Sequence, residues 1–217
     1  METVAVLDYG MSNLRSVAKA LEHVCEGNRR VLVCTTPEEL LQADRVVFPG
    51  QGAIGDCMRN LKERGLDEAL RECMKTKPYL GLCLGLQSLM QESDEDGGTA
   101  GLGWLQGNVV RFRGDMHEPG TGARLKIPHM GWNEVLPARE HSLWSGIPED
   151  SRFYFVHSYY VRPADRAVIA ATTHYGVEFV SAVAKDNVFA VQFHPEKSQR
   201  AGLQLLGNFL TWDGLSP

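Results

Sequence analysis

Short apolar runs alternate with helical patterns through the first half of the chain. The runs are continuous, which is typical of strands buried on both faces of a parallel sheet. Between them, apolar residues recur every three or four positions, as in Leu14, Val17 and Leu21, and predict amphipathic helices. The predicted strands are 3–7, 31–34, 45–48 and 79–82, and the predicted helices are 13–24, one that begins at Thr36-Pro37, 56–62 and 67–75.

The second half has closely spaced strand candidates with few helices between them. Short connections favour antiparallel pairing, whereas parallel pairs need long crossovers. We therefore predict an α/β fold with an open, doubly wound, mostly parallel sheet and an antiparallel extension. The predicted strands of this half are 104–112, 132–136, 151–156, 168–172, 178–184 and 188–193, followed by a helix at 198–210.

Composition narrows the classes of protein to consider. The 217 residues are enough for one substantial core, so a single domain spanning 1–217 is predicted. The net charge is −5 and no Lys/Arg run is present, which argues against nucleic acid as a partner. No apolar run approaches the length of a membrane span, and no secretory signal is predicted at the N-terminus.

Cysteine usage points to a reducing compartment. The number of cysteines, five, is odd, their spacing is irregular, and no Cys-x-x-Cys is present. This pattern argues against a disulfide framework and against a zinc site, so we predict a cytoplasmic protein without a metal. Four of them have no recognisable neighbourhood and are interpreted as core or surface thiols: Cys25, Cys34, Cys57 and Cys73.

The fifth cysteine, Cys83, directly follows the predicted strand 79–82 and has glycines two residues before and after it, Gly81 and Gly85. Glycines on both sides relieve crowding at a sharp strand-to-helix turn, the elbow that presents a nucleophile. A buried core cysteine would also fit, because free cysteine is among the most buried residue types.

Polar or glycine-rich loops also follow strands at 8–13 and 49–53. The first lacks Gly-x-Gly-x-x-Gly and a P-loop lysine, so no nucleotide cofactor is predicted.

A histidine and a carboxylate stand together near the end of the last predicted strand, as His194-Pro195-Glu196. An imidazole can take the proton of a thiol, whose ionised form is the nucleophile. The carboxylate of Glu196 can fix the tautomer of His194, which is the role of a third triad member. By itself the pair would more commonly be a strand-end histidine beside a solvated glutamate. Combined with the elbow cysteine, it predicts a Cys–His–Glu site.

These residues resemble the signature of the class I glutamine amidotransferases, which reads here as Gly81-x-Cys83-x-Gly85-x-Gln87 followed by His194-Pro-Glu196. Four further blocks resemble the glutaminase subunits of imidazole glycerol phosphate synthase within that family. They are Asp-Tyr-Gly-Met-Ser-Asn at 8–13, Pro-Gly-Gln-Gly-Ala at 49–53, Pro-His-Met-Gly-Trp-Asn at 128–133 and Tyr-Phe-Val-His-Ser-Tyr at 154–159. The resemblance implies the flavodoxin-like fold of this family.

The resemblance also implies the chemistry. Cys83 would attack the side-chain carboxamide of glutamine, His194 would protonate the departing ammonia and then activate water, and Glu196 would support His194. Oxyanion donors would come from the backbone N–H of Leu84 and from the 49–52 loop. Gln87 would bind glutamine, although an exposed helix residue would also fit that position, and His157 lacks the neighbouring carboxylate of a base. The residues implied in oxyanion and glutamine binding are Gly50, Gln51, Gly52, Leu84, Gln87, His157, Ser158 and Tyr159.

A partner is implied as well. It would be a (β/α)₈-barrel cyclase in a 1:1 heterodimer, which uses the ammonia to make imidazole glycerol phosphate and an aminoimidazole carboxamide ribotide in histidine biosynthesis. Lys197 directly follows Glu196 at the mouth of the site, whereas Trp132 also fits an ordinary core aromatic. The residues implied in the partner interface are Met130, Trp132, Asn133 and Lys197.

Two other functions remain compatible with the sequence. A stand-alone cysteine hydrolase of the same fold, such as a γ-glutamyl hydrolase, would turn over without a partner. A catalytically silent regulatory homologue would not turn over at all, although such proteins commonly lose one of the residues that are intact here as Cys83, His194 and Glu196.

Gln51 departs from the small apolar residue that the family usually carries in the Pro-Gly-x-Gly loop. A peptide flip in this loop is one proposed gate between silent and active glutaminase, so we expect Gln51 to shift the balance between the two loop states. Gln51→Val should therefore change the ratio of partner-stimulated to basal glutaminase activity. A ratio equal to that of the unsubstituted chain would contradict this role.

Overall fold

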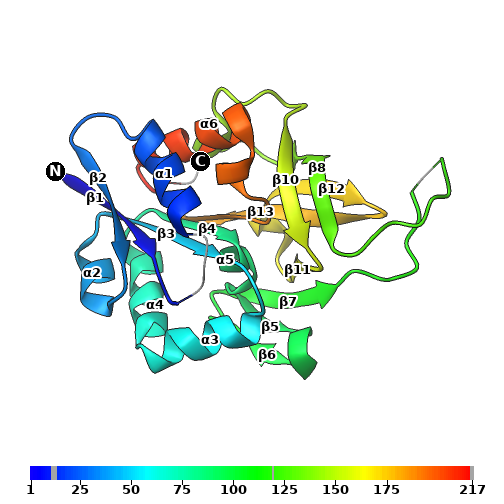
Figure 1. Cartoon of the computed structure of the whole chain (residues 1–217), viewed down its shortest axis with the longest axis horizontal. Helices are drawn as coiled ribbons and strands as arrows, with labels where there is room; N and C mark the ends of the chain where they lie inside the picture. Colours follow the sequence, from blue (N-terminus) through cyan, green and yellow to red (C-terminus); the bar gives the residue numbers. More distant parts are fainter. Residues whose placement is uncertain (11–13, 119, 216–217) are drawn as a thin grey trace.

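The computed structural model in Figure 1 describes residues 1–10, 14–118 and 120–215 and contains a large mixed sheet between two layers of helices. Five strands form its parallel half in the order β2-β1-β3-β4-β14. The expected parallel sheet is thus confirmed, and its last strand comes from the C-terminal part of the chain. These strands are β1 (Glu2–Leu7), β2 (Arg29–Cys34), β3 (Arg45–Gly50), β4 (Tyr79–Cys83) and β14 (Val188–Val191).

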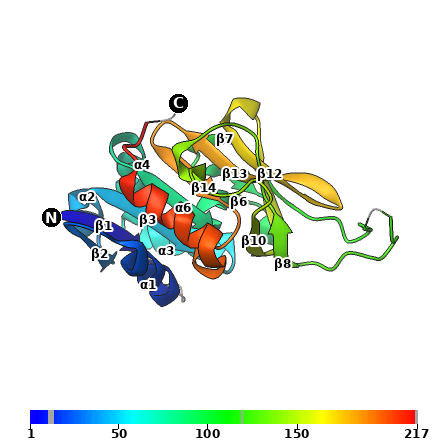
Figure 2. The same ribbon diagram turned by 90° about the horizontal axis from the view of Figure 1, so that it is seen from above.

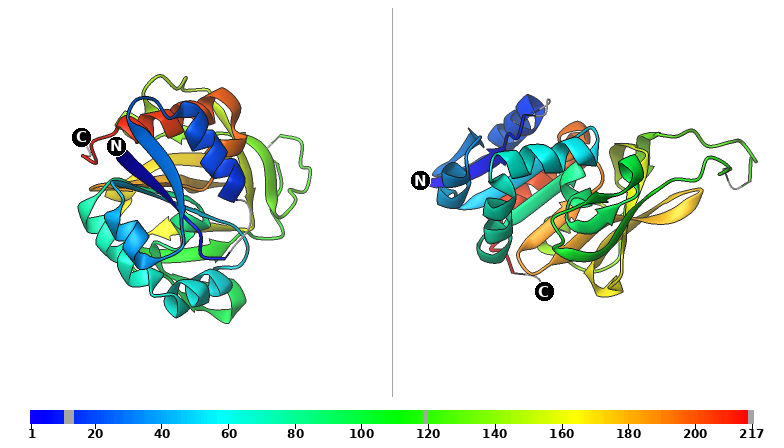
Figure 3. Two further views of the ribbon diagram at one scale, coloured as in Figure 1. Left: turned by 60° about the vertical axis from the view of Figure 1, so that its left-hand side comes forward. Right: turned by 90° about the horizontal axis from the view of Figure 1, so that it is seen from below.

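Helices cover both faces of the parallel half, as the left view of Figure 3 shows. α1 (Leu14–Val24) and α6 (Gln199–Thr211) contact each other on one face. Asn13, where the first helix was expected to begin, lies outside the described residues. The other face carries α2 (Pro37–Gln42), α3 (Ile54–Glu63) and α4 (Leu66–Thr76). The start of α2 agrees with the sequence, because Thr36 caps it and forms a capping box with Glu39.

The sheet continues beyond β14 as the expected antiparallel extension. β13 (Val177–Lys185), β11 (Tyr159–Pro163) and β7 (Leu105–Arg111) follow in this order, with antiparallel pairing throughout. The outer strands are β5 (Met90–Ser93), β6 (Thr99–Ala100), β9 (Leu136–Pro137) and β12 (Ile169–Tyr175).

β8 (His129–Glu134) and β10 (Arg152–His157) form a separate two-stranded antiparallel sheet. Figure 2 shows this small sheet beside the extension, away from the parallel strands β1 and β2. The short helical segments are α5 (Leu84–Gln87) and the 3₁₀ turns η1 (Glu95–Gly97), η2 (Ser142–Trp144), η3 (Arg166–Val168) and η4 (Pro195–Lys197). No helix in the described part of the chain has the length and apolar character that a membrane crossing requires.

Several boundaries differ from the sequence expectation in the second half. The expectation of one strand at 132–136 is wrong, because this range covers two strands. β8 begins at His129 and ends at Glu134, and the separate strand β9 begins at Leu136 and pairs with β12. The strand expected at 168–172 begins one residue later, after η3, and runs to Tyr175. β5, β6 and β11 were not expected. β5 and β6 are short and rich in polar residues, and β11 has only five residues, so their pairing depends on neighbouring strands rather than on local pattern.

Alternate residues of the parallel strands feed two hydrophobic cores, one on each face. In β1, Ala5 and Leu7 join the core under α2–α4, whereas Val4 and Val6 join the core under α1 and α6. Successive side chains of a strand point to opposite faces of the sheet, and here both faces are buried, so each strand contributes to both cores. The carboxyl ends of β3, β4 and β14 consequently lie at one edge between these layers.

A buried arginine at the amino end of β3 ties the sheet to the C-terminal helix. Arg45, only 8% exposed, donates hydrogen bonds to the carbonyl oxygens of Phe209 and Trp212 at the end of α6. Its Nε also pairs with the carboxylate of Glu2. A cation at a helix C-terminus satisfies carbonyls that have no intrahelical donor and complements the helix dipole.

We expect Arg45→Ala to destabilise the fold by about 3 kcal/mol, because it leaves two buried carbonyls without this donor and Glu2 with Arg29 as its remaining partner. Arg59→Ala is the matched control, since its ion pair with Asp56 is exposed and should be worth about 0.5 kcal/mol or less. Urea unfolding of both variants measures the difference. Equal midpoints for the two variants would contradict the structural role of Arg45.

Candidate active site

Cys83 is the last residue of β4 and lies directly before α5, with φ 53° and ψ −101°. This positive φ is strained for a residue other than glycine, and it is typical of the elbow that presents a nucleophile. The flanking glycines make the turn possible. A Cβ on Gly85 would lie 2.1 Å from the carbonyl oxygen of Phe48, and one on Gly81 would lie 2.8 Å from the carbonyl oxygen of Gly85.

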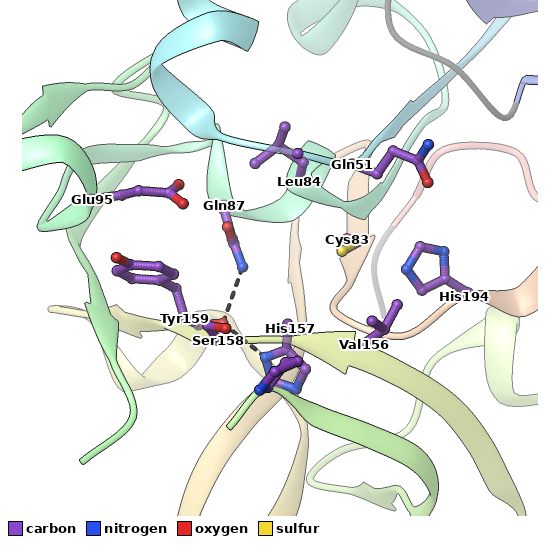
Figure 4. A pocket seen from close by; sticks show the side chains of 12 residues that line it. Gln51, Cys83, Leu84, Gln87, Glu95, Val156, His157, Ser158, Tyr159 and His194 are labelled. Carbon is purple, nitrogen blue, oxygen red and sulfur yellow. Dashed lines mark hydrogen bonds between the residues drawn. The ribbon is translucent and has the colours of Figure 1, made fainter. Parts of the chain in front are cut away.

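His194 reaches the same edge from the neighbouring strand. β14 pairs in parallel with β4, so the chain after Val191 emerges beside the elbow, and the His194 ring faces the Cys83 sulfur in Figure 4. The N–H of His194 donates to the Tyr154 carbonyl (2.9 Å), and the Ser198 hydroxyl donates to the His194 carbonyl (2.6 Å). The backbone around the imidazole is therefore fixed on both sides.

The imidazole Nδ1 of His194 donates to Oε1 of Glu196 at 2.9 Å, and both side chains are almost fully buried. This bond fixes the proton on Nδ1 and aims Nε2 toward the sulfur, as in hydrolytic triads. Burial alone would lower the pKa of His194. The adjacent Cys83 sulfur and the Glu196 carboxylate outweigh burial and raise this pKa above its ordinary value. The protonated form of this imidazole is thereby favoured.

A pocket of about 500 Å³ opens over Cys83 and runs toward η1 and β11. Its size is that of an ordinary small-molecule site. In Figure 4, Gln51 and His194 lie on one side of Cys83, and Glu95 and Tyr159 lie at the opposite end. Nine residues expected in the site line it: Gln51, Gly52, Cys83, Leu84, Gln87, His157, Ser158, Tyr159 and His194.

Two expected residues of the site do not line the pocket. Glu196 lies behind His194. Gly50 is paired with Cys83 across β3 and β4, where a Cβ would lie 2.7 Å from both Leu84 Cβ and the Tyr9 hydroxyl. The absence of a side chain at Gly50 therefore lets Leu84 and Tyr9 pack closely against the backbone of β3.

Gln87 is 5% exposed, so the alternative of a solvent-exposed helix residue is wrong. Its Nε2 donates to the Tyr159 carbonyl (3.0 Å) and to Oε1 of Gln192 (3.1 Å). The Nε2 of Gln192 in turn approaches the Cys83 sulfur at 3.6 Å. The elbow and the far wall of the pocket are thus joined by two side-chain amides.

The sequence did not point to Gln192 or to Glu95. Gln192 lies just beyond the end of β14, and its place two residues before His194 in the same block is the signal that could have found it. Glu95 lies in η1, where no motif marks it, and its Oε2 accepts a hydrogen bond from the N–H of Ile54 (3.0 Å). Pro128 and Val156 also line the pocket.

The four residues expected at a partner interface lie on the surface near β8 or η4. Met130 is 62% exposed and Trp132 is 44% exposed, so Trp132 is not a core residue. Lys197 is exposed, and its ammonium lies 5.8 Å from the centre of the Tyr154 ring. Asn133 is half-buried, and its amide donates to the carbonyl of His174.

None of the histidines, cysteines and carboxylates in the described ranges cluster as a metal site requires. Cys25, Cys34, Cys57 and Cys73 are free, and the last three are buried. Burial raises the pKa of the Cys57 thiol to about 12, so this thiol is not reactive.

An elbow cysteine, an imidazole that is oriented by a carboxylate, and a pocket at the carboxyl edge of a parallel sheet together define the triad class of cysteine-dependent amide hydrolases. Within that class, the chain belongs to the class I glutamine amidotransferase family, whose model matches residues 5–212. The expected family and fold are confirmed.

Curated relatives match over nearly the whole chain. The imidazole glycerol phosphate synthase subunit HisH of Aromatoleum aromaticum is 56% identical over 98% of this chain and 99% of its own. The protein of the same name from Dechloromonas aromatica is 58% identical over 97% of both chains. A solved structure of a putative GMP synthase protein from Thermoplasma acidophilum superimposes with a TM-score of 0.69 at 19% identity, covering 97% of this chain and 93% of its own. That likeness shows the fold.

We expect Gly85→Ala to abolish the elbow, because the added Cβ meets the Phe48 carbonyl in a fully buried strand. The cost should be at least about 4 kcal/mol, or failure to fold. Gly207→Ala is the matched control: it is also a helical glycine, its nearest atom is Val24 Cβ at 3.9 Å, and it should gain up to about 1 kcal/mol. Thermal unfolding compares the two variants, and a folded Gly85→Ala with unchanged stability would contradict the close packing.

Proposed function

We propose that this chain, as one domain over residues 1–217, is the glutaminase subunit of imidazole glycerol phosphate synthase. It hydrolyses glutamine to glutamate and ammonia and supplies the ammonia to a cyclase subunit in histidine biosynthesis. The single observation that carries the proposal is the set of Cys83, His194 and Glu196 at the carboxyl edge of the sheet, in a chain more than half identical to HisH subunits over nearly its whole length.

The reaction begins with the Cys83 thiolate, which attacks the carboxamide carbon of glutamine and forms a tetrahedral oxyanion. The oxyanion needs donors that are in place beforehand. The N–H of Leu84 is in the first position of α5, where an amide has no intrahelical acceptor, and it directly follows the nucleophile. The second donor comes from the loop of Gly50, Gln51 and Gly52, which lies on the adjacent strand end.

His194 acts as the acid and then as the base. Because the pKa of its imidazole is raised, it carries a proton at neutral pH and gives it from Nε2 to the departing ammonia. The neutral imidazole then takes a proton from the water that attacks the thioester, and glutamate leaves. Glu196 holds the ring through Nδ1 and stabilises its charged form.

The opposite end of the pocket suits the α-amino and α-carboxyl groups of glutamine. The Glu95 carboxylate can pair with the ammonium group, and the backbone of His157, Ser158 and Tyr159 forms the facing wall. Gln87 occupies the middle of the pocket between these groups and Cys83. The pocket therefore accepts a substrate with a zwitterionic end and a carboxamide end.

We propose a cytoplasmic 1:1 heterodimer with a (β/α)₈-barrel cyclase that docks on β8 and η4. Met130 and Trp132 present an exposed apolar surface on β8. The Tyr154 ring contacts both Trp132 and the Lys197 ammonium, so Lys197 lies beside this surface. Apolar side chains this exposed favour a partner surface. Enclosed delivery has a chemical reason, because ammonia released into water at neutral pH is mostly protonated and no longer nucleophilic.

The decisive variant is Cys83→Ala, assayed in the complex with the cyclase. Glutamine-dependent product formation should fall by about a thousandfold or more, whereas ammonia-dependent formation should stay within about twofold, since only the nucleophile is lost. Cys25→Ala is the control and should retain both activities, because its half-buried thiol does not line the pocket.

Other outcomes would favour the other functions. Full glutamine hydrolysis by the isolated chain, unaffected by the cyclase and its nucleotide substrate, would indicate a stand-alone hydrolase. Failure of a glutamine-analogue electrophile to label Cys83 in the complex would indicate a silent homologue.

A further inference from the structure

Two buried histidines meet beneath the glutamine pocket. His129 of β8 and His157 of β10 are directly opposite each other in the small sheet, and both are at most 5% exposed. Nδ1 of His129 lies 2.9 Å from Nε2 of His157, and Nδ1 of His157 lies 2.7 Å from the Tyr159 carbonyl oxygen. The catalytic steps derived above use neither imidazole ring.

The protons of this chain of hydrogen bonds can be assigned from either end. A carbonyl oxygen only accepts, so Nδ1 of His157 carries a proton and donates to Tyr159. Burial lowers the pKa of His157 to about 3, so the ring is neutral and its Nε2 accepts. Nδ1 of His129 must then donate to it.

The other end requires the same arrangement. Oδ1 of Asn133 accepts from the N–H of Glu134, which identifies Nδ2 as the donor toward Nε2 of His129 at 3.2 Å. Burial lowers the pKa of His129 to about 4, so this ring too is neutral and holds its single proton on Nδ1. Every hydrogen bond from Asn133 to Tyr159 therefore points in one direction and none is frustrated.

The chain ends on the atom that also holds Gln87. The Tyr159 carbonyl accepts both from His157 and from Nε2 of Gln87, and Gln87 is joined through Gln192 to Cys83. Figure 4 shows His157 and Gln87 converging on this carbonyl from two sides. The ring of His129 is itself fixed by stacking between Phe155 and Tyr175.

The chain begins on the strand that presents the exposed apolar surface. His129 and Asn133 point from β8 into the protein, while the alternate residues Met130 and Trp132 point outward. A displacement of β8 would thus reach the pocket through hydrogen bonds as well as through packing.

We propose that His129 and His157 are positioning residues of the glutaminase, which hold the Tyr159 carbonyl and Gln87 in place for glutamine and tie the pocket to β8. The proposal rests on the function proposed above. Without the chain of hydrogen bonds through His129 and His157, the Tyr159 carbonyl would lose one of its two donors. Gln87 would then lose its fixed acceptor.

The test compares His129→Asn with His129→Leu in the complex with the cyclase, in the presence of the cyclase's nucleotide substrate. Asparagine and leucine have nearly the same shape, so both variants lose the stacking on Phe155 and Tyr175 equally. Only asparagine keeps an N–H donor at the place of Nδ1. We expect kcat/KM for glutamine to be about tenfold or more lower for leucine than for asparagine, mostly through KM.

Ammonia-dependent product formation is the control for assembly and should be equal in the two variants. The same pair of substitutions at His141, a buried histidine that contacts Phe189 and Trp212, should show no difference in kcat/KM. Equal kcat/KM for the two His129 variants would overturn the proposal. Lack of glutamine hydrolysis by the unsubstituted complex would instead overturn the proposed function.

A second measurement uses the unsubstituted chain, so it does not depend on whether a variant folds. In the unsubstituted chain labelled with ¹⁵N-histidine, both rings should show the Nδ1–H tautomer at pH 7, which is the minor form of free histidine. Detection of the Nε2–H tautomer or of a doubly protonated ring at His129 or His157 would overturn the proposal.

Discussion

The site depends on one packing constraint: α5 lies so close to β3 and β4 that only glycine fits on both sides of Cys83. The carbonyl oxygen of Phe48 occupies the space of a side chain at Gly85. This contact holds the backbone of Cys83 at a positive φ, a conformation that would otherwise relax. The buried sheet supplies the stability that offsets this strain.

The order of strands in the sheet explains why the remaining groups come from distant parts of the chain. β14 joins the parallel half next to β4, so His194 and Cys83 leave neighbouring strands at one edge. The far wall comes from β10 and β11, which belong to different sheets and meet at His157, Ser158 and Tyr159. The parallel half thus carries Cys83 and His194, and the antiparallel part carries the opposite wall of the pocket.

The two histidine environments show how burial and partners set different roles. His194 and His157 are both buried, but His194 has a carboxylate and a sulfur beside it, so its pKa is raised. For His157, burial lowers the pKa, and its hydrogen bond to the Tyr159 carbonyl offsets this only in part. One imidazole is suited to proton transfer and the other to fixed hydrogen bonding.

The sequence by itself determined the strands of the parallel half, the elbow and the Cys–His–Glu set, because these features rest on local patterns: apolar runs, flanking glycines and a short His-Pro-Glu spacing. It did not determine Glu95, Gln192 or the His129–His157 pair, nor the strands β5, β6 and β11. Those depend on which segments meet in space, and polar side chains acquire a partner only when tertiary pairing brings one within hydrogen-bond reach. Likewise, Trp132 could be interpreted from sequence as a core residue, and only the direction of β8 decided that it lies on the surface.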